Sequence, residues 1–174
     1  MNDSQEKTAV LDQAGGDLFN FAIEREDVKW LMQQLSQSSR VTLATFEYEL
    51  QILKIISVGW GISYLLAGTP KRKAALGELY WGAVNDFSKQ LSETTGLMTG
   101  QDIDYFEILK IRLDQYVQAM EDNPQATEPA TVIGPAFAGL CGHADDLFAA
   151  MAGSKMFANA VARVRQYLET LKLR

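Results

Sequence analysis

The 174-residue chain is short of the residues that build metal and redox sites, with one cysteine, Cys141, and one histidine, His143. A single cysteine excludes an internal disulfide and a cysteine-rich zinc site, and it fits a reducing compartment. A single histidine excludes the two Glu-x-x-His elements of a di-iron bundle. We therefore predict no metal site and no cofactor.

The chain also lacks the signals of a sheet. It has only four prolines, three of them between residues 122 and 135, and no run in which apolar and polar residues alternate between turn signals. Helical spacing of apolar residues recurs instead. We predict a single all-α domain over residues 18–174, a bundle of about six helices, at about 26–38, 41–67, 70–95, 102–120, 134–153 and 154–171. Residues 1–17, closed by Gly15 and Gly16, are predicted to form a loose N-terminal arm.

The segment 41–67 is predicted to be the long central helix of the bundle. Glu47, Gln51 and Lys54 form one polar stripe on its first half, and no charge follows until Lys71. A helix that is apolar on all sides is buried in protein or in lipid. Because a membrane span needs ~20 apolar residues and this charge-free window is shorter, we expect a buried protein core and no membrane span.

Small residues recur at helical spacing in the same segment. Ser57 and Gly61 form one pair, and Gly59 and Ser63 form a second pair on the opposite side. Glycine in a helix interior is destabilising by about 0.5–1 kcal/mol relative to alanine. We expect neighbouring elements to approach this helix closely on both sides.

Charge is distributed in blocks. Residues 101–150 carry nine acidic and two basic residues, whereas residues 151–174 carry five basic and one acidic, within a net charge of −6. An acidic total argues against general nucleic-acid binding, which needs a basic face. We predict that the two blocks pack against each other.

No motif of a known chemistry is present. There is no Gly-x-Ser-x-Gly, P-loop or dinucleotide fingerprint. Cys141 and His143 are two residues apart and would point about 200° apart on a helix. The N-terminus lacks the basic and apolar stretches of a secretory signal, so we predict a cytoplasmic protein. The leading functional hypothesis is a non-enzymatic interaction or regulatory module, with an enzyme whose site is assembled from scattered residues kept as an alternative.

A second hypothesis is a binder of a small apolar or amphiphilic anion in a pocket between helices. Three cations follow the turn at Gly68–Pro70, and the free N–H groups of a helix start suit a phosphate or carboxylate. Solvated side chains, or pairing with the acidic block, also explain these cations, and exposed charges of this kind are common. The predicted ligand-binding residues are Lys71, Arg72, Lys73, Trp60, Tyr64, Tyr80 and Trp81.

The third hypothesis is self-association through the predicted helix 134–153, which has two unlike faces. The bulky face, assigned to the core, carries Phe137, Leu140, Leu147, Phe148 and Met151. The opposite face carries the small residues Ala138, Gly142, Ala149 and Gly153. A small face lets another backbone approach, either a second copy in a homodimer or another helix of the same chain.

Overall fold

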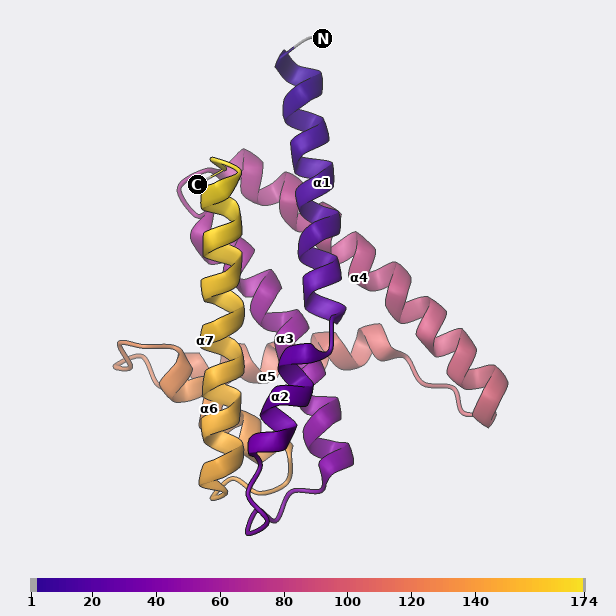
Figure 1. Ribbon diagram of the computed structural model, residues 1–174, viewed down its shortest axis with the longest axis vertical. Coiled ribbons are helices and arrows are strands. Elements are labelled where there is room, and N and C mark those ends of the chain that lie inside the picture. Colours follow the sequence, from indigo (N-terminus) through magenta and orange to yellow (C-terminus); the bar gives the residue numbers. More distant parts are fainter. Residues whose placement is uncertain (1–2, 174) are drawn as a thin grey trace.

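The computed structural model describes residues 3–173, with side chains from residue 8 onward, and this part of the chain consists of α-helices and connecting turns (Figure 1). The predicted all-α class is confirmed. The helices are α1 (Asp3–Ile23), α2 (Glu26–Gln34), α3 (Leu43–Leu65), α4 (Pro70–Thr99), α5 (Tyr105–Glu121), α6 (Ala130–Leu140) and α7 (Leu147–Thr170).

The N-terminal segment is helical, so the predicted loose arm is wrong for the described part of residues 1–17. Ala14, Leu18 and Ala22 of α1 are buried, and the helix packs on α4 and α3. Gly15, interpreted from the sequence as a break, faces the Leu79 side chain of α4 so closely that a Cβ atom would overlap it. The glycine therefore serves helix packing. Residues 1 and 2 lie outside the described range.

Helix α3 is the central helix, as predicted, and contacts each of the other six helices. Its residues from Ile52 to Gly59 are all buried. No helix in the described range combines the length and the hydrophobicity that crossing a membrane requires. The charge-free half of α3 is buried by protein from Ile55 to Gly59 and at Gly61, Ile62 and Leu65, whereas Tyr64 is exposed.

The small residues of α3 mark close approaches on two sides, which confirms that prediction. A Cβ atom on Gly59 would overlap the ring of Trp81 in α4. A Cβ atom on Gly61 would lie 3.3 Å from the Cβ atom of Val164 in α7. Helices α4 and α7 thus reach the backbone of α3 from different directions.

Two residues of the polar stripe of α3 donate hydrogen bonds to backbone carbonyl groups at the end of α1. Gln51 Nε2 donates to the Ala22 carbonyl at 2.8 Å, and Lys54 Nζ donates to the Glu24 carbonyl at 2.8 Å. Carbonyl groups at a helix C-terminus lack partners within the helix. The fully buried Lys54 also lies 3.2 Å from the Asp27 carboxylate at the start of α2. The stripe therefore holds the bend between α1 and α2.

The predicted helix 134–153 is wrong, because the chain turns between α6 and α7. Gly142 has φ +85°, in the left-handed region that favours glycine. Asp146 then begins α7, its carboxylate accepting from the backbone N–H groups of Phe148 and Ala149 at 3.0 and 3.1 Å. Helix α7 continues through Ser154, which was predicted to cap a separate helix.

Asp146 also fixes the loop before α3. Its second oxygen accepts from Ser39 Oγ at 2.7 Å and from the Arg40 N–H at 3.0 Å. Desolvation raises the pKa of this carboxyl, but the hydrogen bonds from Ser39 and from the backbone outweigh it and leave the pKa lowered. One carboxylate therefore starts α7 and joins it to the loop that leads into α3.

The turn reverses the predicted roles of the two faces. Ala138 and Ala149 are fully buried, and Gly153 is so close to Phe137 that a Cβ atom would overlap its ring. Ala138, Ala149 and Gly153 are thus buried within the chain, while Gly142 lies in the turn. The bulky residues of α7 assigned to the core are exposed instead: Leu147, Phe148 and Met151.

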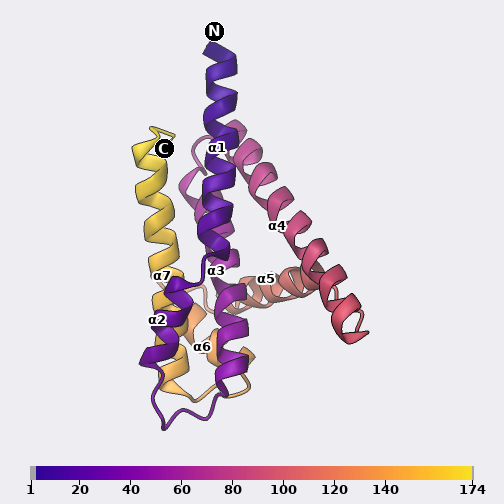
Figure 2. The same ribbon diagram turned by 45° about the vertical axis from the view of Figure 1, so that its right-hand side comes forward.

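Helix α4 extends beyond the bundle. Figures 1 and 2 show it diverging from α3 along its length, with α5 returning to the bundle from the far side. The first half of α4 buries Leu76, Tyr80 and Val84, whereas Leu97 and Met98 at its end are 90% and 80% exposed. We refer to residues 85–99 as the α4 extension.

Candidate functional site

The predicted ligand-binding residues do not form one pocket. Tyr80 is fully buried and donates its hydroxyl proton to the Ile55 carbonyl at 2.7 Å, so it belongs to the core. Lys71 is exposed at the start of α4, and Arg72 Nη1 donates to the Leu173 carbonyl at 3.0 Å. The other four residues line two separate grooves.

The first groove combines a cation with an indole. Lys73 and Trp81 of α4 line it together with Gly59 and Ser63 of α3, over a volume of about 370 Å³. Thr69 occupies the N-cap position of α4, but its hydroxyl donates back to the Leu66 carbonyl at 3.3 Å and does not cap the helix. This groove therefore contains two of the predicted ligand-binding residues, Lys73 and Trp81.

The second groove, of about 280 Å³, lies between α3 and α7 and contains the other two aromatic residues. Trp60 and Tyr64 stack with their ring centroids 4.8 Å apart and their planes 12° apart, and Phe157 lies 5.1 Å from Trp60. Because the two rings stack on each other, they form a flat apolar wall and do not surround a ligand.

The residues that could act as nucleophiles or metal ligands have structural roles instead. Burial, followed by the charges of Glu49 and Asp146, raises the pKa of the Cys141 thiol to about 12, so this thiol stays protonated at neutral pH and is a poor nucleophile. His143 lies in the turn, where its backbone N–H donates to the Ala138 carbonyl at 3.0 Å. Within the described residues, no three metal-ligating side chains converge.

The buried ion pair between α3 and α5 is likewise self-contained. Arg112 donates to both oxygens of Glu49, at 2.7 and 2.9 Å, and Glu49 is 3% exposed. A bidentate pair of this kind uses the main donors of the guanidinium and both carboxylate oxygens. It orients α5 against α3.

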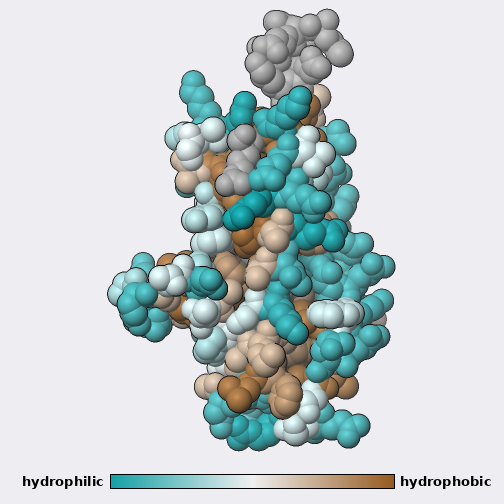
Figure 3. All heavy atoms as spheres, turned by 60° about the vertical axis from the view of Figure 1, so that its left-hand side comes forward, coloured by the Kyte–Doolittle hydropathy of each residue, from teal (hydrophilic) through white to brown (hydrophobic). Residues whose placement is uncertain are grey.

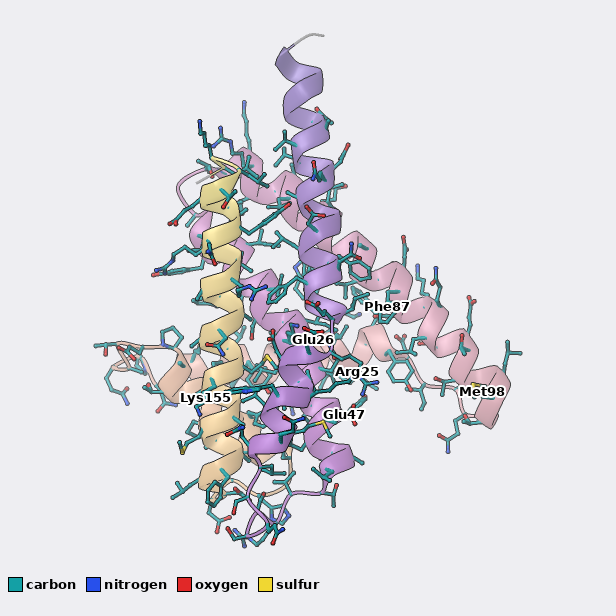
Figure 4. All side chains as sticks on the ribbon, in the orientation of Figure 1. Arg25, Glu26, Glu47, Phe87, Met98 and Lys155 are labelled. Atoms are coloured by element: carbon teal, nitrogen blue, oxygen red, sulfur yellow. The ribbon has the colours of Figure 1, made fainter. Side chains whose placement is uncertain are left out.

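The most distinctive surface lies along the α4 extension. At about 100° per residue, Tyr80, Val84, Phe87, Leu91 and Met98 fall within about 60° of one another on α4. This face is buried in the bundle at Tyr80 and Val84, is 40% exposed at Leu91, and is 80% exposed at Met98. Figure 4 shows Phe87 beside the bundle and Met98 near the far end of the helix. The face therefore continues past the elements that cover it.

A groove opens beside this face. It has a volume of about 430 Å³ and is mainly apolar, with the ion pair between Arg25 and Glu47 at its edge. Phe87 at its base makes an edge-to-face contact with Phe19 of α1, with ring centroids 5.8 Å apart. The groove is lined by residues of the α1–α2 bend, α3 and α4: Ile23, Arg25, Ala44, Glu47, Tyr48, Gln51, Ile55, Phe87 and Leu91.

A second exposed apolar surface, the α7 patch, consists of Trp30, Leu147, Phe148 and Met151. Their exposed fractions are 49%, 75%, 44% and 57%. Lys155 Nζ, one turn after Met151, lies 5.9 Å from the centre of the Trp30 ring, which connects the start of α7 to α2. Figure 3 shows apolar side chains at the lower end of this face, where α7 begins.

The sequence predicted helix α4 to end near residue 95. The helix reaches Thr99, and Gly100, with φ 70°, is its C-cap. The sequence does contain a signal for the longer helix. Met98 is spaced seven residues from Leu91, and Gly100, a residue type that often ends helices, comes two residues after Met98. The α7 patch was missed because Leu147, Phe148 and Met151 were assigned to the core face of an unbroken helix 134–153.

Comparison with known protein families, characterised proteins and solved structures found no match to this chain.

Proposed function

We propose that this chain is a non-catalytic interaction module that docks an amphipathic helical surface of a partner protein on the α4 extension. The observation that carries the proposal is the face from Phe87 to Met98, which continues a core-forming face of α4 into solvent. Exposed apolar surface of this kind characterises interaction sites. The adjacent groove has room for side chains of a docked helix.

The surroundings of the extension favour a partner with basic flanks. Between residues 85 and 108 the chain carries five acidic residues and one basic residue, Lys89. Asp86, Lys89 and Glu93 lie about 100° or more around the helix from Phe87, so the apolar face itself is free of charge. An apolar centre with a charged rim is the usual arrangement of a docking surface.

A synthetic amphipathic helical peptide of leucine and lysine is the direct probe. We expect it to bind the protein, and we expect Leu91→Glu with Met98→Glu to weaken binding about tenfold or more by placing charges on the docking face. Tyr64→Glu, which alters an exposed aromatic residue at the far end of α3, is the matched control and should bind like the wild type. Absence of binding up to about 100 µM, or equal binding by the double variant, would contradict the proposal.

A second candidate function is the binding of an amphiphilic anion in the groove of Lys73 and Trp81. The cation and the indole in one groove of about 370 Å³ favour it. Decyl phosphate should raise the melting temperature of the protein, and Lys73→Ala should remove most of that rise. Decyltrimethylammonium, with the same chain and the opposite charge, should have no such effect. An equal response to both probes would exclude this function.

We place the module in the cytoplasm as a prediction, because its single cysteine fits a reducing compartment.

A further inference from the structure

We propose that the partner is a second copy of this chain, which binds head to tail: the α4 extension of one molecule docks on the α7 patch of the next. This inference rests on the proposed docking function of the extension and adds the identity of its occupant. The two surfaces belong to different parts of one chain, so the contact is heterologous.

The α7 patch has the chemistry that the extension requires. Leu147 and Met151 are four residues apart and Phe148 and Met151 three apart, so all three share one face of α7, with Trp30 of α2 beside it. Lys155 continues this face by a further turn. Aromatic residues and methionine are enriched at the centres of protein interfaces, and Trp30, Phe148 and Met151 are all half-exposed here.

The charges of the two surfaces are complementary. The α4 extension carries two acidic residues and one basic, and Asp102 and Asp104 follow in the loop after it, whereas Lys155 continues the face of the α7 patch. At the edges of the patch, Lys29 is exposed, Asp145 pairs with Arg40, and Glu26 lies one turn before Trp30. Complementary fields of this kind steer association and set its orientation.

The chain does not bring these surfaces together internally. The acidic and basic blocks were predicted to pack against each other, and α6 of the acidic block does pack on α7, but α6 itself carries no charge. The acidic helix α5 packs mainly on α4, α6 and α3. Lys110 and Arg112 of α5 pair with Glu107 and Glu49 instead. In both Figure 1 and Figure 2 the end of α4 and helix α7 lie on opposite sides of the molecule. Within one molecule, therefore, neither surface covers the other.

Two variants, each disabling one surface, test the geometry of association. Met98→Glu places a charge on the apolar face of the extension, and Met151→Glu places a charge in the α7 patch. Both positions are exposed, at 80% and 57%, so both variants should fold, which circular dichroism checks. Sedimentation velocity should show wild-type association that rises with concentration and weakens with salt. Each variant alone should associate at least about tenfold more weakly.

Mixing the two variants is the decisive step. Met98→Glu retains a working patch and Met151→Glu retains a working extension, so an equimolar mixture should form a one-to-one dimer that grows no further. A mixture that stays monomeric would overturn the inference, because it would show that an intact extension and an intact patch do not bind each other. A wild type that is monomeric at several hundred micromolar, or a variant that associates like the wild type, would overturn it as well.

The experiments distinguish failure of the docking function from failure of self-association. If the leucine–lysine peptide binds the extension but the wild type does not self-associate, the docking function stands and the second copy is the wrong occupant. If the peptide does not bind, the docking function itself is contradicted. Tyr64→Glu serves again as the control and should associate like the wild type.

Discussion

Two buried tyrosines of this protein differ in what their hydroxyl groups contact. Tyr80 donates to the Ile55 carbonyl at 2.7 Å, whereas the hydroxyl of Tyr116 has no hydrogen-bond partner within the described residues. Burial raises the pKa of both well above its usual value, so both hydroxyl groups are neutral at physiological pH. The difference in stability that they confer should therefore come from hydrogen bonding.

We expect Tyr80→Phe to lower the free energy of unfolding by about 0.5–1.5 kcal/mol, the usual contribution of one such hydrogen bond. Tyr116→Phe removes a buried hydroxyl that lacks a partner, so it should leave stability unchanged or raise it by up to about 1 kcal/mol. Urea denaturation of the two variants checks the pair, each serving as the control of the other. A larger loss in Tyr116→Phe than in Tyr80→Phe would show that the Tyr116 hydroxyl has a stabilising contact.

Asp146 links stability to pH. Its folded-state pKa is lowered despite desolvation, so its contribution is fully present above the unfolded pKa of about 3.9 and is lost as the pH falls through the folded value. We expect Asp146→Asn to cost about 1–2 kcal/mol at pH 7, because one carboxylate accepts four hydrogen bonds here. The gap between wild type and variant should narrow below about pH 4.

The control for this experiment is the neighbouring carboxylate. Asp145→Asn removes an exposed ion pair with Arg40 and should have a smaller effect at pH 7. Thermal unfolding from pH 3 to pH 8 measures both variants. A stability gap for Asp146→Asn that does not depend on pH would contradict the assigned role of its charge.

At the scale of elements, glycine has opposite roles in different helices. Gly134 of α6 lies against α7 so closely that a Cβ atom would overlap the Ala150 carbonyl and the Ser154 hydroxyl. Gly82 of α4 is exposed and has open space around its Cα atom. The first glycine permits helix packing, whereas the second only weakens a helix.

We expect Gly82→Ala to raise the free energy of unfolding by about 0.5–1 kcal/mol, the usual difference between glycine and alanine in a helix. Gly134→Ala should lower it by about 1–3 kcal/mol, because α6 and α7 must move apart to accommodate the methyl group. Chemical denaturation of both variants provides the measurement. If Gly134→Ala were as stable as the wild type, the close packing of α6 on α7 would be wrong.

At the scale of the whole molecule, the helices should differ in local stability. Helix α3 is covered by six neighbours, whereas the α4 extension leaves the bundle and ends with Leu97 and Met98 exposed. Elements with few buried contacts open without global unfolding. The extension is thus free to adjust to a partner while the core stays intact.

Native-state hydrogen exchange should detect this difference. We expect amides of residues 52–62 to exchange only on global unfolding, and amides of residues 90–99 to open with a free energy at least about 2 kcal/mol lower. Residues 76–84 of α4 provide the internal control, since they belong to the same helix but lie in the bundle. Equal protection along all of α4 would contradict this description.

The sequence by itself determined the helical class and the position of the central helix. Apolar residues at helical spacing and the charge-free second half of α3 are local features, and periodicity reports them directly. The close approaches at Gly59 and Gly61 were also predictable, because small residues recur at helical spacing on two sides of this apolar segment.

Only the tertiary structure decided which faces are inside. Periodicity shows that Phe148 and Ala149 lie on different faces of α7, but not which face meets the core, because both large and small residues can be buried. The turn at Gly142 and the cap at Asp146 resolve this by letting α6 and α7 pack through their small residues. The bulky residues then remain outside. The tertiary structure also decided that Lys73 and Trp81 line one groove and that Trp60 and Tyr64 line another. Helices α4 and α7 pack on different sides of α3, and local residue spacing does not specify which side each helix takes.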